Sequence, residues 1–176
     1  FLMSYLKKLK FFLLFSILLT NSVFSAEKIL HIDINFLMNN SLAGKSIKLQ
    51  IEKINNSNTK NFKKLQTNLK NEESKLISQK DILNESDYLV KLNEFKKKIN
   101  EFNIKKNEAV KDLQKKKIES QKKLIDNLIS ILTEYSTKNS VDYILRKENV
   151  LIGKSALDIT ADILKALDAK IKNIKL

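Results

Sequence analysis

The sequence predicts an α+β protein that is mostly helical, with a small β-sheet head and one long antiparallel α-helical coiled-coil arm. Three observations predict this fold. The 176 residues include no proline and only two glycines, which is typical of long helices with few tight turns. The stretch 45–139 contains neither glycine nor proline. On both sides of that stretch lie short segments in which apolar and polar residues alternate, as they do in half-buried β-strands.

Residues 1–25 are expected to be a signal peptide that is removed on export. The lysines of "KKLK" at 7–10 form a positive start, and the apolar core Phe11–Leu19 is too short to span a bilayer as a helix. Cleavage after Ser25 places the small Val23 and Ser25 at the positions that a signal peptidase reads. An uncleaved membrane anchor is the alternative. The mature protein is therefore expected to be exported.

The head is expected to combine residues 26–44 and 140–176. In its first part, 29–34 alternates as a half-buried strand, with His31 on the face that points to the surface or to an interface. A short helix over 36–42 follows. We expect this first part of the head to supply one strand and one helix.

The second part of the head contains three further expected elements. Apolar residues alternate over 141–145, a polar turn covers 147–149, and 150–152 is apolar again, which predicts a hairpin that pairs with the strand at 29–34. From Asp158 onward, apolar residues recur at helical spacing behind a cap at Asp158 or Thr160. The chain is therefore expected to end in a helix.

Residues 45–139 are expected to form the arm. The apolar residues recur in steps of three, four and seven, which indicates a narrow coiled-coil seam. The seam positions are Phe62, Leu65, Leu69, Leu76, Tyr88, Leu92, Phe95, Ile99 and Phe102. A bend is predicted near 84–88, and the asparagine-rich 55–58 is a second place where the helix could be interrupted. The two halves then form an antiparallel hairpin that returns the chain to the head.

The head is small, and because the chain has no cysteine, no disulfide can stabilise it. On its own it would be only marginally stable, and its sheet would keep unpaired edges. We therefore expect a symmetric oligomer that is joined through the heads. The expected oligomerisation residues are the apolar strand positions Leu30, Ile32, Ile34, Val141, Tyr143, Leu145, Val150 and Ile152.

Charge is concentrated on the arm. The chain has 33 basic and 20 acidic residues, and every basic residue but Arg146 is lysine. Residues 45–139 hold 22 lysines and 13 acidic residues, a net charge of +9, while the head is nearly neutral. Lysine is a flexible point charge, so this surface suits diffuse attraction to acidic partners better than shaped recognition.

The sequence lacks the residues that catalysis requires. One histidine and no cysteine leave no nucleophile with a base and no metal cluster. "GKS" occurs at 44–46 and at 153–155, but a phosphate-binding loop also needs a glycine five positions earlier, where Asn39 and Glu148 stand. We expect no enzyme activity and no cofactor.

Two stretches resemble the Skp family, the OmpH-like periplasmic chaperones. They are "ILHIDINFLMNNSLAGKSI" at 29–47 and "VDYILRKENVLIGKSALDITADILKAL" at 141–167. The resemblance implies a trimer whose heads join in a small barrel-like body and whose arms enclose a cavity. It also implies an ATP-independent holdase that binds unfolded outer-membrane proteins and prevents their aggregation. Ala156 stands where many relatives have proline, and the basic cluster that binds lipopolysaccharide in some relatives cannot be placed here.

The candidate client-binding residues follow from the resemblance and the charge of the arm. They are Lys63, Lys64, Lys96, Lys97, Lys98, Lys105, Lys106, Phe62, Tyr88 and Phe95. For the aromatic residues, packing between the arm helices is the favoured interpretation and client contact is the alternative. The expected partners are unfolded outer-membrane proteins, further copies of the chain and an anionic lipid or lipopolysaccharide surface, without specific nucleic-acid binding. The alternative functions are a basic coiled-coil protein that binds nucleic acid or anionic surfaces nonspecifically, and a structural spacer of the envelope.

Overall fold

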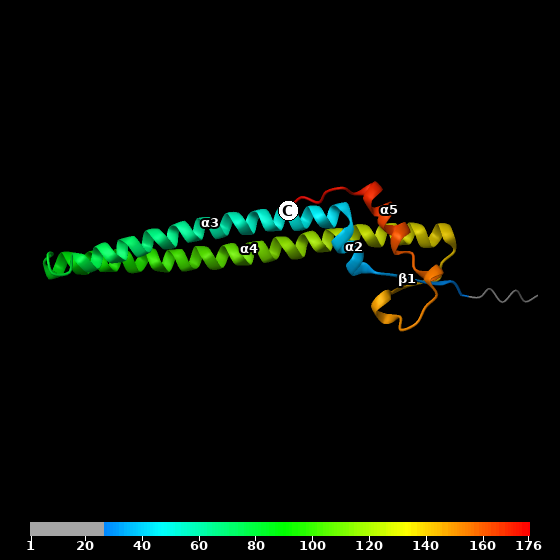
Figure 1. Ribbon diagram of the computed structural model, residues 1–176, viewed down its shortest axis with the longest axis horizontal. Helices are drawn as coiled ribbons and strands as arrows, with labels where there is room; N and C mark the ends of the chain where they lie inside the picture. Colours follow the sequence, from blue (N-terminus) through cyan, green and yellow to red (C-terminus); the bar gives the residue numbers. More distant parts are fainter. Residues whose placement is uncertain (1–26) are drawn as a thin grey trace, which may run out of the picture.

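The computed structural model describes residues 27–176, and the expected signal peptide lies outside this range. The elements follow in the order β1 (Ile29–Ile32), α2 (Ile34–Asn40), α3 (Leu42–Ser78), α4 (Glu85–Asn139), β2 (Tyr143–Arg146), η1 (Lys147–Asn149), η2 (Ser155–Leu157) and α5 (Thr160–Lys170). Figure 1 shows α3 and α4 as a long rod, with the other elements gathered at one end. The prediction of a mostly helical chain with a small sheet is confirmed. No helix in 27–176 combines the length and hydropathy needed to cross a membrane.

The sheet of the head is a parallel pair. Ile29 lies opposite Tyr143, and Ile32 lies opposite Arg146. Parallel neighbours need a long crossover connection, and here α2 and the whole arm form it. The predicted strand at 29–34 is too long, because Ile34 begins α2. The carboxylate of Asp33 accepts a hydrogen bond of 2.7 Å from the backbone N–H of Phe36 and so caps that helix.

The predicted pairing of the segment after Val141 with the first strand is confirmed, but the predicted hairpin is wrong. Residues 147–149 form a tight turn, but 150–152 are not a strand, and the sheet within the described part of the chain has two strands. The far edge of β1 is occupied instead by the segment before α5: the backbone N–H of Ile159 donates to the carbonyl of His31 over 3.0 Å. The side chains of Leu151 and Ile152 are left 98% and 90% exposed.

The two arm helices have defined ends. The hydroxyl of Ser41 accepts from the backbone N–H of Gly44 and caps α3, which then continues without interruption through the asparagine-rich 55–58. The side chain of Asn84 accepts a hydrogen bond of 2.9 Å from the backbone N–H of Asp87 and caps α4. The turn between the helices covers 79–84, just before the predicted bend. At the other end of α4, Ser140 takes a left-handed conformation with φ 50° and redirects the chain into β2.

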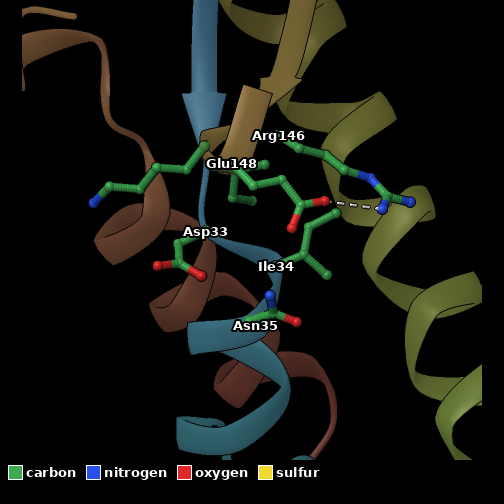
Figure 2. A pocket seen from close by; sticks show the side chains of 7 residues that line it. Asp33, Ile34, Asn35, Arg146 and Glu148 are labelled. Atoms are coloured by element: carbon green, nitrogen blue, oxygen red, sulfur yellow. Dashed lines mark hydrogen bonds and ion pairs between the residues drawn. The ribbon is translucent and has the colours of Figure 1, made fainter. Parts of the chain in front are cut away.

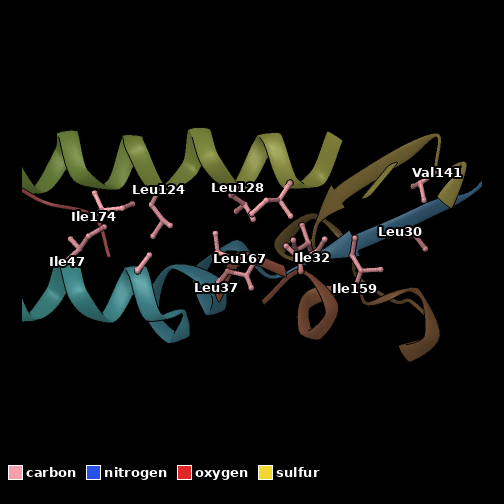
Figure 3. Close-up of a cluster of buried hydrophobic side chains, with 13 residues drawn as sticks. Leu30, Ile32, Leu37, Ile47, Leu124, Leu128, Val141, Ile159, Leu167 and Ile174 are labelled. Carbon is pink, nitrogen blue, oxygen red and sulfur yellow. The ribbon is translucent and has the colours of Figure 1, made fainter. Parts of the chain in front are cut away.

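The core of the head draws on the base of the arm as well as on the expected head residues. Leu37 of α2 and Leu167 of α5 are fully buried, and in Figure 3 they lie below α4, between α3 and β1. Leu124 and Leu128 of α4 are buried in the same cluster, together with Ile47 of α3. The long helix α4 is therefore both one half of the arm and one wall of the head.

The C-terminal residues pack back on α3. The side-chain amide of Gln50 donates to the carbonyl of Ile174 over 2.7 Å, and the hydroxyl of Ser46 donates to Asn173 over 2.6 Å. Ile174 is buried against the core. This tail fixes the first turns of α3 to the head, as the red segment beside α3 in Figure 1 shows.

Candidate functional site

The arm is a pair of helices that run in opposite directions. Near the tip, Lys91 of α4 donates to the side chain of Gln79 over 3.0 Å, and farther along Lys98 pairs with Glu72 over 2.7 Å. Closer to the head, the rings of Phe62 and Phe102 meet edge to face with centroids 6.0 Å apart. Residue numbers fall along α3 as they rise along α4, and Figure 1 shows the two helices side by side.

Only a narrow strip of each arm helix is covered by the other. Leu76 is the most buried of the predicted seam residues, with 8% of its surface exposed. Leu69, Leu92 and the seam aromatics are half-buried, while Leu65 and Ile99 remain exposed. The seam joins two helices and encloses no interior of its own, so most of the arm surface is in contact with solvent.

The aromatic candidates for client contact lie in this seam. Phe62 packs on Phe102, in accord with the interpretation that these rings join the helices, and Tyr88 and Phe95 are half-buried. Shallow hollows open beside the rings. One of about 270 Å³ is lined by Phe62 and Phe102, and another of about 250 Å³ by Phe95 and Leu76.

The lysine candidates divide into two groups. Lys63 and Lys106 line the hollow beside Phe62, and Lys98 and Lys105 line hollows farther toward the tip. These four lysines therefore stand beside apolar surface in the seam. The other three, Lys64, Lys96 and Lys97, are exposed and line none of these hollows.

The same lysines differ in their pairing. A hydrogen bond from Lys98 to Glu72, together with the attraction of that carboxylate, raises the pKa of Lys98. Among residues 27–176, the other six lysine candidates have no ion-pair partner: Lys63, Lys64, Lys96, Lys97, Lys105 and Lys106. Their charges remain available to an acidic partner.

A further hollow lies in the head, beside the end of the strand pair. It has a volume of about 350 Å³, and it is lined by 32–35 and 146–148. Figure 2 shows Arg146 and Glu148 paired on one side of it, with a nitrogen–oxygen distance of 3.3 Å. Asp33 and Asn35 lie opposite, where Asp33 is engaged as the cap of α2. Each of these charged side chains already has a partner, so the hollow offers little to a ligand.

Asp158 is the most strongly perturbed acid of the head. Burial alone would raise its pKa, but hydrogen bonds from the Thr160 hydroxyl and from Lys147 outweigh this effect and lower the pKa to about 2. The Lys147 nitrogen lies 2.9 Å from the carboxylate, and the pKa of Lys147 is raised in turn. This cluster holds the segment between β2 and α5 in place.

The expectation that His31 lies at the surface or an interface is wrong. His31 is 8% exposed, and its Nδ1 lies 3.8 Å from Asp158 without a hydrogen-bond partner. The side chain is covered because the segment leading to α5 crosses β1 at this point. Within 27–176 no group of three or more potential metal-ligating side chains comes together.

The expected oligomerisation residues lie in different environments. Leu30, Ile32 and Val141 are buried in the core of their own chain, and Ile34 and Val150 are half-buried. Three are exposed and accessible to a second chain: Tyr143 at 55%, Leu145 at 42% and Ile152 at 90%.

Sequence reasoning followed the seam and missed a second set of apolar residues on α4. These side chains are exposed rather than packed on α3, and they are Leu89, Ile104, Ile118, Ile125 and Ile129. The sequence did contain a signal for them. Ile104, Ile118, Ile125 and Ile129 are separated by 14, 7 and 4 positions, spacings that bring residues back to one side of a helix.

Comparisons with known proteins agree with this architecture. The model of the OmpH-like outer membrane protein family matches residues 28–167. A crystal structure from Caulobacter crescentus CB15, described as a candidate outer membrane chaperone (OmpH-like), superposes with a TM-score of 0.81 at 19% identity. The match covers 86% of this chain and 90% of that one. A search among curated proteins found no match. Since the family model spans most of the sequence, from the first strand into the closing helix, the chain belongs to the OmpH-like family of outer membrane proteins.

Proposed function

We propose that the protein is an ATP-independent periplasmic holdase that binds unfolded outer-membrane proteins and prevents their aggregation. The observation that carries this proposal is the arm: a long, thin pair of helices with a narrow seam and unpaired lysines, in a chain of the OmpH-like family. The similar Caulobacter crescentus structure, described as a chaperone, is consistent with this role.

The physical basis of the proposal is many weak contacts. An unfolded client is an aggregating chain, and a deep apolar pocket would release it slowly. Separate exposed apolar side chains and lysines each bind weakly, but together they hold one chain tightly because every contact raises the local concentration for the next. The excess of lysine on the arm would also speed the encounter with acidic clients.

The proposal includes a homotrimer whose arms surround the client. The open outer edge of β2 and the exposed Tyr143, Leu145 and Ile152 support contact between heads, because exposed strand edges and apolar side chains favour pairing with another chain. Three arms would triple the positive charge around an enclosed space. Analytical ultracentrifugation of the mature chain should give a trimer, and a folded monomer at micromolar concentration would contradict this part.

The holdase role is tested by light scattering. A urea-unfolded outer-membrane β-barrel protein of net negative charge is diluted into buffer with or without the mature protein, in the absence of nucleotide. The protein should suppress scattering at a low molar excess. Capture should weaken as salt rises, because the screening length falls from about 8 Å at physiological salt to about 3 Å at 1 M. Scattering that is unchanged by the protein would contradict the holdase role.

A further inference from the structure

The side of α4 that faces away from the seam carries a continuous row of exposed residues. The row rises from Leu89 to Ile129 in steps of three and four, the spacing of side-chain neighbours along one face of a helix. Its apolar members are 39–57% exposed: Leu89, Ile104, Ile118, Ile125 and Ile129. We call this set, together with the polar residues between its members, the outer row.

The polar residues of the outer row are of two kinds. Four are lysines, Lys97, Lys111, Lys115 and Lys122, and the others are Asn93, Asn100 and Asn107. In the described chain, Lys97, Lys111 and Lys122 form no ion pair, while Lys115 approaches Glu119 only at 4.0 Å. The nine acidic residues of α4 all fall at other positions of the helix. The outer row itself is thus apolar and positively charged, while acidic residues such as Glu101, Glu119 and Asp126 lie beside it, one helical turn from its lysines.

The other arm helix has no equivalent. The seam residues of α3 face α4, and its other strongly exposed apolar side chains beyond the first turn are Leu49 and Ile77. They lie 28 positions apart, and the exposed residues between them outside the seam are polar. Solubility alone would leave the outer face of α4 as polar as that of α3. The difference indicates that the outer row serves for binding.

The charge of the outer row identifies the kind of partner. A second arm of the same chain carries the same excess of lysine, so two outer rows facing each other would repel. An acidic chain with exposed apolar side chains complements both properties of the row. We propose that the outer row of α4, rather than the aromatic seam, is the surface on which the arm binds an acidic, unfolded outer-membrane client. This inference rests on the proposed holdase function.

The two residue types in the row are expected to act on different rate constants. Removing the unpaired lysines lowers the electrostatic attraction, so the triple variant Lys97→Gln/Lys111→Gln/Lys122→Gln should slow client association at low salt. Removing apolar contact shortens the life of the complex, so Ile104→Asn/Ile118→Asn should raise the dissociation rate about tenfold. The matched controls are Lys53→Gln/Lys60→Gln/Lys75→Gln and Leu49→Asn/Ile77→Asn on α3. The lysine control removes the same net charge, so it should slow association clearly less than the triple variant of the outer row, and the apolar control should leave the dissociation rate near that of the unmodified protein.

Site-specific cross-linking tests the surface directly. The chain contains no cysteine, so one introduced thiol is the single attachment point for a photocrosslinker. Ile118→Cys places it in the outer row, Leu49→Cys on the exposed side of α3 and Leu69→Cys in the seam. Each labelled protein is mixed with the urea-unfolded acidic β-barrel protein and irradiated. We expect cross-links to the client mainly from the Ile118→Cys variant.

Each other outcome has a distinct meaning. Equal client cross-links from all three positions, or cross-links mainly from Leu69→Cys, would overturn the assignment of the row while leaving the holdase role intact. Cross-links from Ile118→Cys to another copy of the chain would make the row a self-interface and would also overturn it. Failure of the unmodified protein to capture the client in the scattering assay would refute the holdase role itself.

Discussion

The head and the arm of this protein solve the problem of stability in different ways. In the head, the side chains of Leu37, Leu124, Ile163 and Leu167 are completely buried, and segments far apart in the sequence meet in one core. In the arm, two helices share a strip of half-buried residues, and most of their remaining surface is exposed to solvent. The comparison teaches that this fold concentrates its packing energy in the head and leaves the arm with surface to offer to a partner.

The largest effect is expected from removing a core side chain in the head. Leu128→Ala takes away a residue that is 1% exposed, and it should lower the free energy of unfolding by about 2–5 kcal/mol. The matched arm variant Leu69→Ala affects a half-buried residue and should cost about 1 kcal/mol. Urea denaturation followed by circular dichroism, at one fixed protein concentration, measures both. Equal costs would show that the arm is packed as tightly as the head.

The two glycines provide the next test, at the junction of head and arm. A Cβ on Gly44 would lie 1.9 Å from the carbonyl oxygen of Met38, so Gly44→Ala must push α2 and α3 apart and should cost about 1–3 kcal/mol. A Cβ on Gly153 would approach only the side chains of His31 and Val150, both at 3.3 Å. Gly153→Ala should therefore cost much less. The thermal unfolding midpoints of the two variants compare them, and an unchanged midpoint for Gly44→Ala would contradict the close approach of α2 and α3.

The acid stability of the head should depend on Asp158. Its pKa falls from 3.8 to about 2 on folding, so its contribution to stability is complete above pH 3.8 and disappears as the pH falls to about 2. The shift corresponds to about 2 kcal/mol. Asp158→Asn should reduce the loss of stability in that pH window by a similar amount, as measured by urea denaturation at several pH values. An unchanged pH dependence would show that the Thr160 and Lys147 contacts do not persist in solution.

The smallest effect is expected for the ion pair of the arm. Lys98 and Glu72 are both substantially exposed, and exposed ion pairs contribute little to stability because water screens them. Glu72→Gln should leave the thermal midpoint unchanged within error, although it removes the cause of the raised pKa of Lys98. Since the head dominates unfolding, hydrogen exchange of the arm amides is the more sensitive readout. A marked rise in exchange would show that single ion pairs support the arm.

The sequence was most informative where structure is local. The absence of glycine and proline over 45–139 predicted two long helices, and the spacing of Phe62, Leu69 and Leu76 predicted which side of α3 meets α4. The turn at 79–84 comes slightly before the predicted bend at 84–88 because Asn84 caps α4. Ser86 and Asp87, which follow it, are also of residue types that serve as caps, so the sequence left the start of the helix open.

Contacts between distant segments were harder to predict. The run at 150–152 has the composition of a strand, but the edge of β1 that could have paired with it is bonded to Ile159 instead. The burial of His31 depends on the same crossing segment. For the candidate site, the lysines of the arm were evident from composition, whereas the outer row became visible only once the seam had been assigned and Ile104, Ile118 and Ile125 were found on the other side of α4.

The shared use of α4 has a mechanical consequence. This helix runs unbroken from the tip of the arm to Asn139, and its last turns hold Leu124 and Leu128 in the core of the head. The arm therefore has no hinge on this side, and spreading the tip requires either bending of α4 or rotation of the whole head. In the proposed holdase, a bulky client that spreads the arms would bend α4, and the resulting elastic strain would weaken client binding and favour release without ATP.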